Sequence, residues 1–298
     1  MTGFKWRAPT KGYRIVTEGG MNVTEVRRIQ IDEDEGALFL ELVEHTFRDY
    51  EPFEVTGLFR TFADLQSVTS DVLRFANRYG HLGNKPEYPE EGLEHPRDLD
   101  PDLDANQLAF YTDKERRQPR VEWRWEQDFL HSVPEPLDQW VEAIEQMRRC
   151  VTKWEACRGG GAQQDMENLA EEINEQLSYK QVEFLLRRSG QKKKFLRLVP
   201  LPGNLLAALW IQFAQAIADD KEFRQCLECG EWFELSTERF RKSRKYCTDA
   251  CKSQGYRDRK AKALRMAQAG KTTADIAAAI GMKESTVEEW IKNNSNRS

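Results

Sequence analysis

The clearest hydrophobic pattern in this chain of 298 residues runs from position 136 to position 157. Apolar side chains recur there at three- and four-residue spacing, so they share one face of a helix, and Pro136 suits its first turn. The same spacing predicts a second helix over residues 166–177, after a break of three glycines. Residues 203–218 are apolar on nearly every side, which indicates a helix at the centre of the core.

Shorter patterns complete the N-terminal part of the chain. Residues 59–80 show a mainly helical pattern, whereas the alternation at 13–17 is typical of a hairpin or an edge strand. Residues 37–43 fit either a strand or a helix, because periodicity alone does not separate the two in a short apolar run. Residues 181–199 predict a β-hairpin that turns at Ser189 and Gly190. We therefore expect an α+β fold whose N-terminal domain is predominantly helical.

A helical hairpin is expected near the C-terminus, over residues 272–292. Ile276 and Ala277 would pack inside the first helix, Gly281 would make the turn, and Val287 and Trp290 would anchor the second helix. This register resembles the helix-turn-helix segments of resolvase-like proteins and of regulators, and that resemblance implies DNA binding.

The second helix of this hairpin mixes favourable and unfavourable groups for DNA contact. Ser285, Thr286 and Lys292 are candidate contacts. Three glutamates on the same helix would repel phosphates, although glutamate can accept a hydrogen bond from cytosine. Dimerisation and binding of a partner protein therefore remain open for this helix.

Composition favours a soluble, folded protein in a reducing compartment. Charged residues make up 32% and hydrophobic residues 39% of the chain. The longest apolar stretch, 205–211, is far shorter than the roughly 20 residues that a membrane span needs, and no secretory signal is evident. Six cysteines, two of them in a Cys-x-x-Cys pair, favour the cytoplasm, and we expect Cys150 and Cys157 to be ordinary core or boundary residues.

The net charge of −5 conceals a strongly basic segment. Residues 239–265 contain eleven Lys or Arg and two Asp or Glu, a local net charge of +9, while the remainder carries −14. A concentration of this kind is typical of contact with a polyanion such as nucleic acid. The predicted hairpin at 181–199 is also basic, either to protect exposed strand edges or as a second phosphate contact.

Four cysteines follow the pattern Cys-x2-Cys-x17-Cys-x3-Cys. Cys226 and Cys229, with Gly230, form a tight knuckle, and the i, i+4 pair Cys247 and Cys251 suits the start of a helix. We predict a closed structural Zn2+ site, with a β-hairpin in the seventeen intervening residues, in the order of a treble-clef finger. Two disulfides, a catalytic dithiol and a cluster of another metal are the alternatives.

The residues around these cysteines resemble a known family. Residues 224–233 and 244–251, with the basic helix after them, are similar to the CGNR-type zinc fingers. The resemblance implies a helical N-terminal domain ahead of the finger and a role as a bacterial transcription regulator. The chain departs from the family at its last ligand, where Cys251-Lys-Ser-Gln254 replaces Cys-Gly-Asn-Arg.

Basic residues of the finger are the other candidate nucleic-acid contacts, because each neutralised phosphate releases condensed counterions. A merely solvated face is the alternative, and Tyr246 and Tyr256 would either stack on bases or pack on the finger. The candidates in the finger are Arg241, Lys242, Arg244, Lys245, Lys252, Arg257, Arg259 and Lys260.

These expectations combine into one functional hypothesis. The N-terminal domain spans 1–221, the finger 222–262 and the helix-turn-helix 263–298. We expect a cytoplasmic, Zn2+-containing, DNA-binding regulator whose N-terminal domain senses a ligand, binds a partner or forms a homodimer. We expect no enzyme, because the four histidines are scattered and no phosphate loop, dinucleotide fingerprint or Gly-x-Ser-x-Gly motif is present. A protein-interaction adaptor and an RNA-binding protein are the alternatives.

Overall fold

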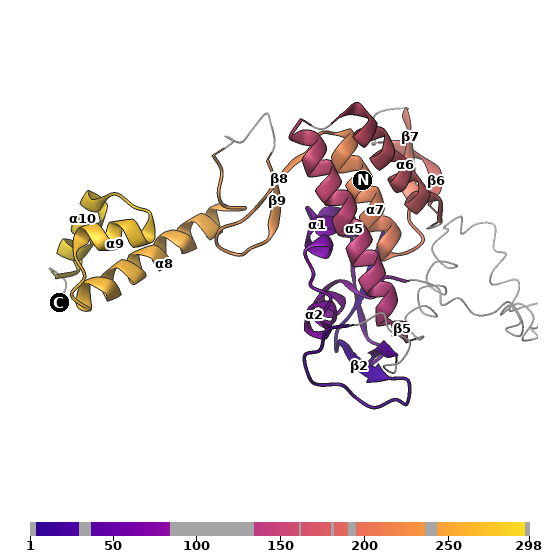
Figure 1. The fold of residues 1–298 in the computed structure, drawn as a ribbon, viewed down its shortest axis with the longest axis horizontal. Helices are drawn as coiled ribbons and strands as arrows, with labels where there is room; N and C mark the ends of the chain where they lie inside the picture. Colours follow the sequence, from indigo (N-terminus) through magenta and orange to yellow (C-terminus); the bar gives the residue numbers. More distant parts are fainter. Residues whose placement is uncertain are drawn as a thin grey trace, which may run out of the picture. The chain divides into compact units, whose positions relative to one another are not determined.

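The computed structural model describes residues 4–29, 37–83, 134–160, 162–179, 182–189, 195–235 and 243–295. Helices and strands are mixed along the chain, which separates into two compact units, Met1–Ile217 and Ala218–Ser298 (Figure 1). The domain boundaries expected at 221/222 and 262/263 stay predictions.

The first unit contains two small antiparallel sheets. β1 (Trp6–Pro9) pairs with β4 (Phe47–Tyr50), and β2 (Tyr13–Thr17), β3 (Leu38–Leu42) and β5 (Glu135–Pro136) form a second sheet in the order β2-β3-β5. The ambiguous run at 37–43 is therefore a strand, because β3 has a partner on each edge. The alternation at 13–17 is confirmed as a strand.

Helices pack against these sheets. The pattern at 59–80 forms two helices, α1 (Leu58–Ala63) and α2 (Thr69–Tyr79), preceded by a short 3-10 turn, η1 (Pro52–Glu54). The long helices expected from periodicity are confirmed as α5 (Leu137–Arg158), α6 (Gln163–Tyr179) and α7 (Leu205–Ala218). The predicted hairpin is β6 (Glu183–Ser189) with β7 (Phe195–Leu201), and its turn lies outside the described residues.

Aromatic residues from distant parts of the chain form the core of the first unit. The Phe213 ring of α7 lies 5.1 Å from the Phe59 ring of α1 and 5.7 Å from the Trp154 ring of α5, measured between centroids. All three side chains are fully buried, as is most of α7, which confirms its expected place in the core. Cys150 is buried and Cys157 is half-buried, as expected for core and boundary residues.

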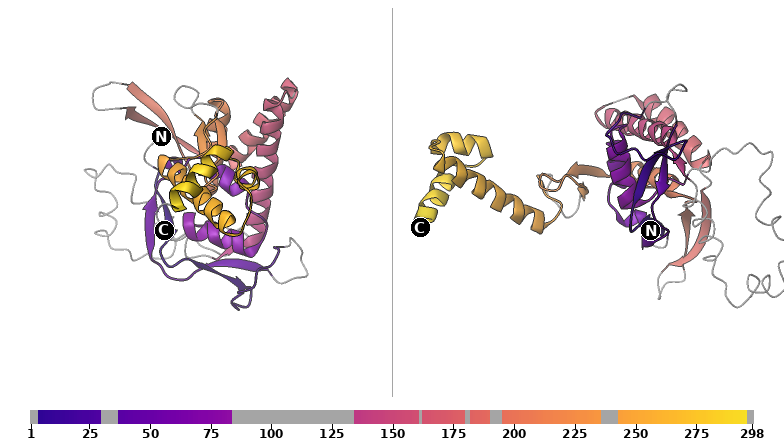
Figure 2. Two further views of the ribbon diagram at one scale, coloured as in Figure 1. Left: turned by 90° about the vertical axis from the view of Figure 1, so that its left-hand side faces the viewer. Right: turned by 90° about the horizontal axis from the view of Figure 1, so that it is seen from below.

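The second unit consists of a small hairpin followed by helices (Figure 2). β8 (Glu222–Gln225) pairs with β9 (Trp232–Leu235), and α8 (Asp249–Gln268), α9 (Thr273–Ile280) and α10 (Glu284–Ser295) follow. The helix α8 is continuous, so a single helix leads from the cysteine-rich part into the C-terminal hairpin.

The position of the hairpin in the finger differs from the expectation. We predicted a hairpin between Cys229 and Cys247, but β9 pairs with β8, which precedes Cys226. The reason is that the cysteine knuckle itself is the turn: the Cys226 N–H donates to the Glu231 carbonyl at 2.9 Å and brings the two strands together. Nothing in local spacing favours this pairing over one further along the chain.

Within the described part of the chain, no helix is both long enough and apolar enough to span a bilayer.

Candidate metal and nucleic-acid site

The first pair of cysteines lies in the turn between β8 and β9. The Gly230 N–H donates to the Cys226 carbonyl at 2.9 Å, and Gly230 has a φ of +72°, which residues with a Cβ seldom adopt. This tight turn directs Cys226 and Cys229 toward a common point. The Leu227 N–H donates to the Lys245 carbonyl at 3.0 Å, which holds the knuckle against the segment that contains the second pair.

The second pair lies at the start of α8. Thr248 is the N-cap of this helix, and its hydroxyl accepts the Cys251 N–H at 3.1 Å. Threonine caps a helix well because its side-chain oxygen satisfies one of the unpaired N–H groups of the first turn. The cap fixes Cys251 within the first turn and Cys247 immediately before it, as the i, i+4 spacing predicts.

The four sulfur atoms form one cluster. They all lie within 4.8 Å of one another, with 3.6 Å between Cys229 and Cys247 and 3.5 Å between Cys247 and Cys251. These separations exceed a disulfide bond of about 2.05 Å, and all four cysteines are free thiols. Tetrahedral Zn2+ with sulfur ligands at about 2.3 Å requires sulfur atoms just under 4 Å apart. The cluster therefore fits a Zn2+ ion, and the two-disulfide alternative does not describe this structure.

Crowding and backbone donors act on these thiols in opposite directions. Burial opposes ionisation of Cys226, but N–H groups of Cys229, Cys247 and Glu228 lower its pKa to about 6. Burial, followed by the neighbouring thiols of Cys251 and Cys229, raises the pKa of Cys247 to about 12. Four thiols this close resist ionising together, and a divalent cation removes that conflict by neutralising the thiolate charge.

Two of the predicted nucleic-acid contacts, Arg244 and Arg259, are half-buried and bond to other groups of the cysteine-rich part. The Arg244 guanidinium donates to the Tyr246 carbonyl at 2.7 Å and to the Cys247 carbonyl, and it lies 5.1 Å from the centroid of the Phe233 ring. The Arg259 guanidinium contacts Tyr246: it donates to the Tyr246 hydroxyl and lies near the Tyr246 ring. Both arginines, together with Tyr246, stabilise the fold around the cysteines.

The remaining predicted contacts of the finger have varied surroundings. Lys245, Lys252 and Arg257 are exposed, Arg257 donates to the Gln254 side chain at 2.7 Å, and Lys260 is half-buried. Successive residues of a helix are about 100° apart, so the cations of α8 are spread around its axis. Arg241 and Lys242 lie outside the described residues.

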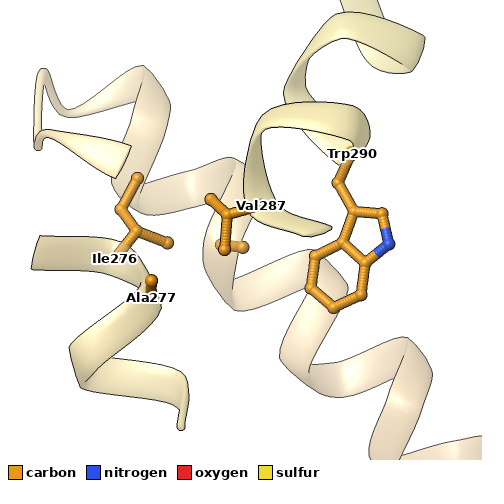
Figure 3. Close-up of a cluster of buried hydrophobic side chains, with 5 residues drawn as sticks. Ile276, Ala277, Val287 and Trp290 are labelled. Atoms are coloured by element: carbon orange, nitrogen blue, oxygen red, sulfur yellow. The ribbon is translucent and has the colours of Figure 1, made fainter. Parts of the chain in front are cut away.

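A hydrophobic core joins α8, α9 and α10 (Figure 3). Ile276 and Ala277 from α9 face Val287 and Trp290 from α10, and Ala263 of α8 is fully buried among them. The register predicted for the helical hairpin is confirmed. What periodicity did not reveal is that the second half of α8 is the third wall of this core.

A left-handed glycine makes the turn between α9 and α10. Gly281 has a φ of +63° and ends α9, and the Met282 N–H donates to the Ala277 carbonyl at 3.0 Å. Such a glycine cap is common at helix ends because glycine has no Cβ to clash in this conformation. The turn sets the angle at which α10 leaves α9.

The surface of α10 shows which candidate contacts are accessible. Ser285 and Lys292 are exposed and Thr286 is half-buried. Glu284 is engaged with α9, since its carboxylate accepts the Thr273 hydroxyl at 2.7 Å. Glu288 and Glu289, which share the solvent side with Lys292, are exposed.

The comparisons with known proteins agree with this three-helix arrangement. A family model described as a homeodomain-like domain, of the helix-turn-helix type, matches residues 256–297. The match begins inside α8, so it includes the half of α8 that packs on α9 and α10. No curated protein and no solved structure shows a significant match to the chain. The C-terminal segment is thus similar to DNA-binding domains, and the resemblance to CGNR-type fingers stays a prediction.

Sequence reasoning missed two exposed lysines near the helical hairpin. Lys271 immediately precedes the Thr272 cap of α9, and Lys283 lies in the turn just before α10. In homeodomain-like folds, the loop between the first two helices contacts the DNA backbone. The signal in the sequence was the i, i+3, i+4 spacing of Ala263, Met266 and Ala267, and the structure confirms that this face of α8 packs on α9 and α10, with the connection to α9 at 269–272.

Proposed function

We propose that this chain is a Zn2+-stabilised DNA-binding protein that regulates transcription, with α10 as the helix that enters the major groove. The observation that supports the proposal most directly is the core of α8, α9 and α10, closed by Trp290, in the segment that matches a homeodomain-like domain. In this class of fold the last helix reads base edges while neighbouring loops hold phosphates.

The exposed groups around α10 have the chemistry that this role requires. Ser285 and Thr286 lie in the first turn of α10, where hydroxyl groups can bond to base edges or phosphates. Lys271, Lys283 and Lys292 come from the loop before α9, the turn before α10 and the second half of α10, and all three are exposed. Lysines at these three positions supply the attraction to phosphates that positions such a helix.

The proposed role of the metal is structural. Four cysteine sulfurs would hold Zn2+, and a site closed by four protein thiolates leaves no position for a substrate. A Zn2+ ion bound there would cross-link the cysteine knuckle to the start of α8. The chain would therefore act by binding rather than by catalysis.

For the first unit we propose a regulatory role. A predominantly helical domain ahead of a DNA-binding module fits a sensor of a ligand, a partner-binding domain or a homodimerisation domain. A protein of this kind would act in the cytoplasm.

A selection with full-length, Zn2+-loaded protein tests the proposal. Random-sequence duplex DNA is enriched at moderate salt, with structured RNA as competitor, and the affinity of the selected duplex is then measured at several salt concentrations. The triple variant Lys271→Gln, Lys283→Gln and Lys292→Gln should reduce the slope of log affinity against log salt by about one per lysine. The matched comparison removes three exposed charges from α8, as Lys252→Gln, Arg257→Gln and Arg265→Gln. Because these cations, two of which are candidate contacts from the sequence, point in different directions around the helix axis, they cannot all meet one duplex, and the slope should change less.

Two outcomes contradict the proposal. Equal losses in both triple variants would mean that α10 does not direct the contact and that general attraction to the basic segment dominates. Loss of the selected duplex to structured RNA would favour an RNA-binding protein instead.

Glu288 and Glu289 support a second candidate function, a docking helix for a partner protein. Two exposed carboxylates on the solvent side of α10 weaken attraction to phosphates and suit a basic protein surface. Absence of any enriched duplex from the selection, at every salt concentration and with Zn2+ bound, would favour this adaptor.

A further inference from the structure

One turn of α8 contacts both the cysteine-rich part and the helix-turn-helix core. On one side, Gly255 is buried against the finger, where an added Cβ would lie 2.7 Å from the Glu228 carboxylate and 3.1 Å from the Tyr246 ring. On the other side, the Tyr256 ring packs edge-on against Trp290, with centroids 5.2 Å apart. The Trp290 indole N–H also donates to the Tyr256 hydroxyl at 2.9 Å. Adjacent residues of one helix thus contact two different cores: Gly255 lies against Tyr246 of the finger, and Tyr256, which is otherwise exposed, lies against Trp290.

The finger side of this turn is tied directly to the cysteine cluster. The Arg259 guanidinium donates to the Tyr246 hydroxyl and lies 5.7 Å from the centroid of its ring. Tyr246 precedes Cys247, and its carbonyl accepts from Arg244 at 2.7 Å. Whatever fixes Cys247 therefore fixes Tyr246, and through it the turn of α8 that contains Arg259.

The apolar core of the finger is small. Its buried apolar residues, within the part of the chain that the structure describes, are Cys226, Phe233 and Leu235, with Tyr246 packed against them. A core this small does not offset the loss of conformational entropy, so metal binding supplies much of the folding free energy in such modules. In its absence, the start of α8 loses the partners that hold it.

From these contacts we infer that metal binding at the four cysteines controls the order of α10, with Tyr256 as the positioning residue that transmits the effect. Metal fixes the first turns of α8, the ordered helix presents Tyr256 to Trp290, and Trp290 closes the core that orients α10. If the chain binds DNA as proposed above, DNA binding should therefore depend on the metal, and this consequence rests on the proposed function. The coupling itself requires only the contacts described above.

Hydrogen exchange of the full-length protein, measured without DNA, tests the coupling. Wild type is compared after loading with Zn2+ and after removal of the metal by a chelator, and the protection of the α10 amides is recorded. Removal should lower this protection as well as that of the start of α8. In loaded Tyr256→Ala, loss of the aromatic pair should lower α10 protection by roughly three- to tenfold, and chelation should then lower it little further.

The controls separate coupling from general destabilisation. Gln254→Ala changes an exposed residue on the opposite side of α8, and its effect on α10 should stay below about twofold. Tyr256→Phe keeps the ring and removes only the acceptor of the indole N–H, so it should retain most of the response to chelation. Both Tyr256 variants should still bind one equivalent of Zn2+.

The inference is overturned if chelation leaves α10 protection in wild type unchanged, or if Tyr256→Ala behaves like Gln254→Ala. These results are independent of DNA binding. If wild type binds its selected duplex equally well with and without metal, the coupling to DNA is wrong while the proposed function stands. If no duplex binds but the exchange result holds, the proposed function is wrong while the coupling stands.

Discussion

Arg244 and Lys245 are neighbours of equal charge with different surroundings. The Arg244 guanidinium bonds to the carbonyls of Tyr246 and Cys247 and lies over the Phe233 ring. A planar guanidinium can make these contacts together, whereas an ammonium group cannot. The Lys245 side chain is exposed, and only its carbonyl contributes to the finger. Charge alone therefore does not identify which of the two residues faces a partner.

We expect Arg244→Gln to weaken metal retention by about tenfold or more, since groups that orient metal ligands commonly have effects of this size. Lys245→Gln removes the same charge and should leave metal retention unchanged. Competition with a chromogenic Zn2+ chelator measures both variants. Equal retention in the two variants would show that the Arg244 contacts do not support the cysteine cluster.

Among the described residues of the first unit, His81 is the one whose protonation should affect stability most clearly. Its ring is buried between Trp6 and Tyr13, at centroid distances of 5.5 and 6.4 Å. Burial lowers the pKa of His81 to about 3, from an ordinary value near 6.5. As the pH falls below 6.5 the unfolded chain takes up the proton first, so stability that is present above pH 6.5 is lost progressively toward pH 3.

Between pH 7.5 and pH 5, this effect should lower the free energy of unfolding of the first unit by about 2 kcal/mol. Urea unfolding of His81→Leu should show a correspondingly smaller loss over the same pH range. His45→Leu, at an exposed histidine, controls for the substitution and should follow wild type. The same pH dependence in both variants would contradict the assignment to His81.

At the scale of elements, α8 has two structural roles in one helix. Its first turn contains Cys251, and its second half contains Ala263, which is fully buried where α8 meets α9 and α10. A small residue at this crossing allows the helices to approach closely, and any larger side chain must displace its neighbours.

Ala263→Leu should therefore lower the stability of the helix-turn-helix core by about 1–3 kcal/mol, because extra methylene groups overpack a filled core. Ala261→Leu places the same side chain on the exposed side of α8 and should change stability by less than about 0.5 kcal/mol. Hydrogen exchange of α9 and α10 in the full-length variants gives both values. A tolerated leucine at 263 would mean that α8 is not packed on the hairpin as described.

At the scale of the whole molecule, the charge of the chain is divided unevenly. The basic segment 239–265 belongs to the second unit, whereas the rest of the chain is acidic overall. Among the described residues of the second unit the basic side chains do not share one face, because Arg244 and Arg259 are half-buried against the finger and the cations of α8 surround its axis. The exposed lysines near α9 and α10 are fewer, but they lie just before α9, just before α10 or on α10, the helix that we propose to enter the major groove.

The amino-acid sequence determined the features that depend on local spacing. Apolar periodicity predicts α5, α6 and α7, and the positions of Ile276, Gly281 and Trp290 predict the helical hairpin. Cysteine spacing predicts that four thiols converge, because a knuckle and a helix start each bring two sulfurs together over a few residues. Apart from the meeting of the two cysteine pairs, which are separated by seventeen residues and come together only in the folded chain, these interactions lie within a short stretch of sequence, so the pattern alone is sufficient.

Tertiary structure decided the features that depend on distant partners. β1 pairs with β4 and β3 pairs with β5 across long separations in sequence, and β8 rather than a later segment pairs with β9. Arg244 and Arg259 are half-buried and bonded within the finger, because their guanidinium groups meet the carbonyl, hydroxyl and ring of Tyr246, which only the folded finger brings to them. The shared role of α8 likewise exists only once Tyr256 meets Trp290, because neither residue has a local pattern that specifies the other.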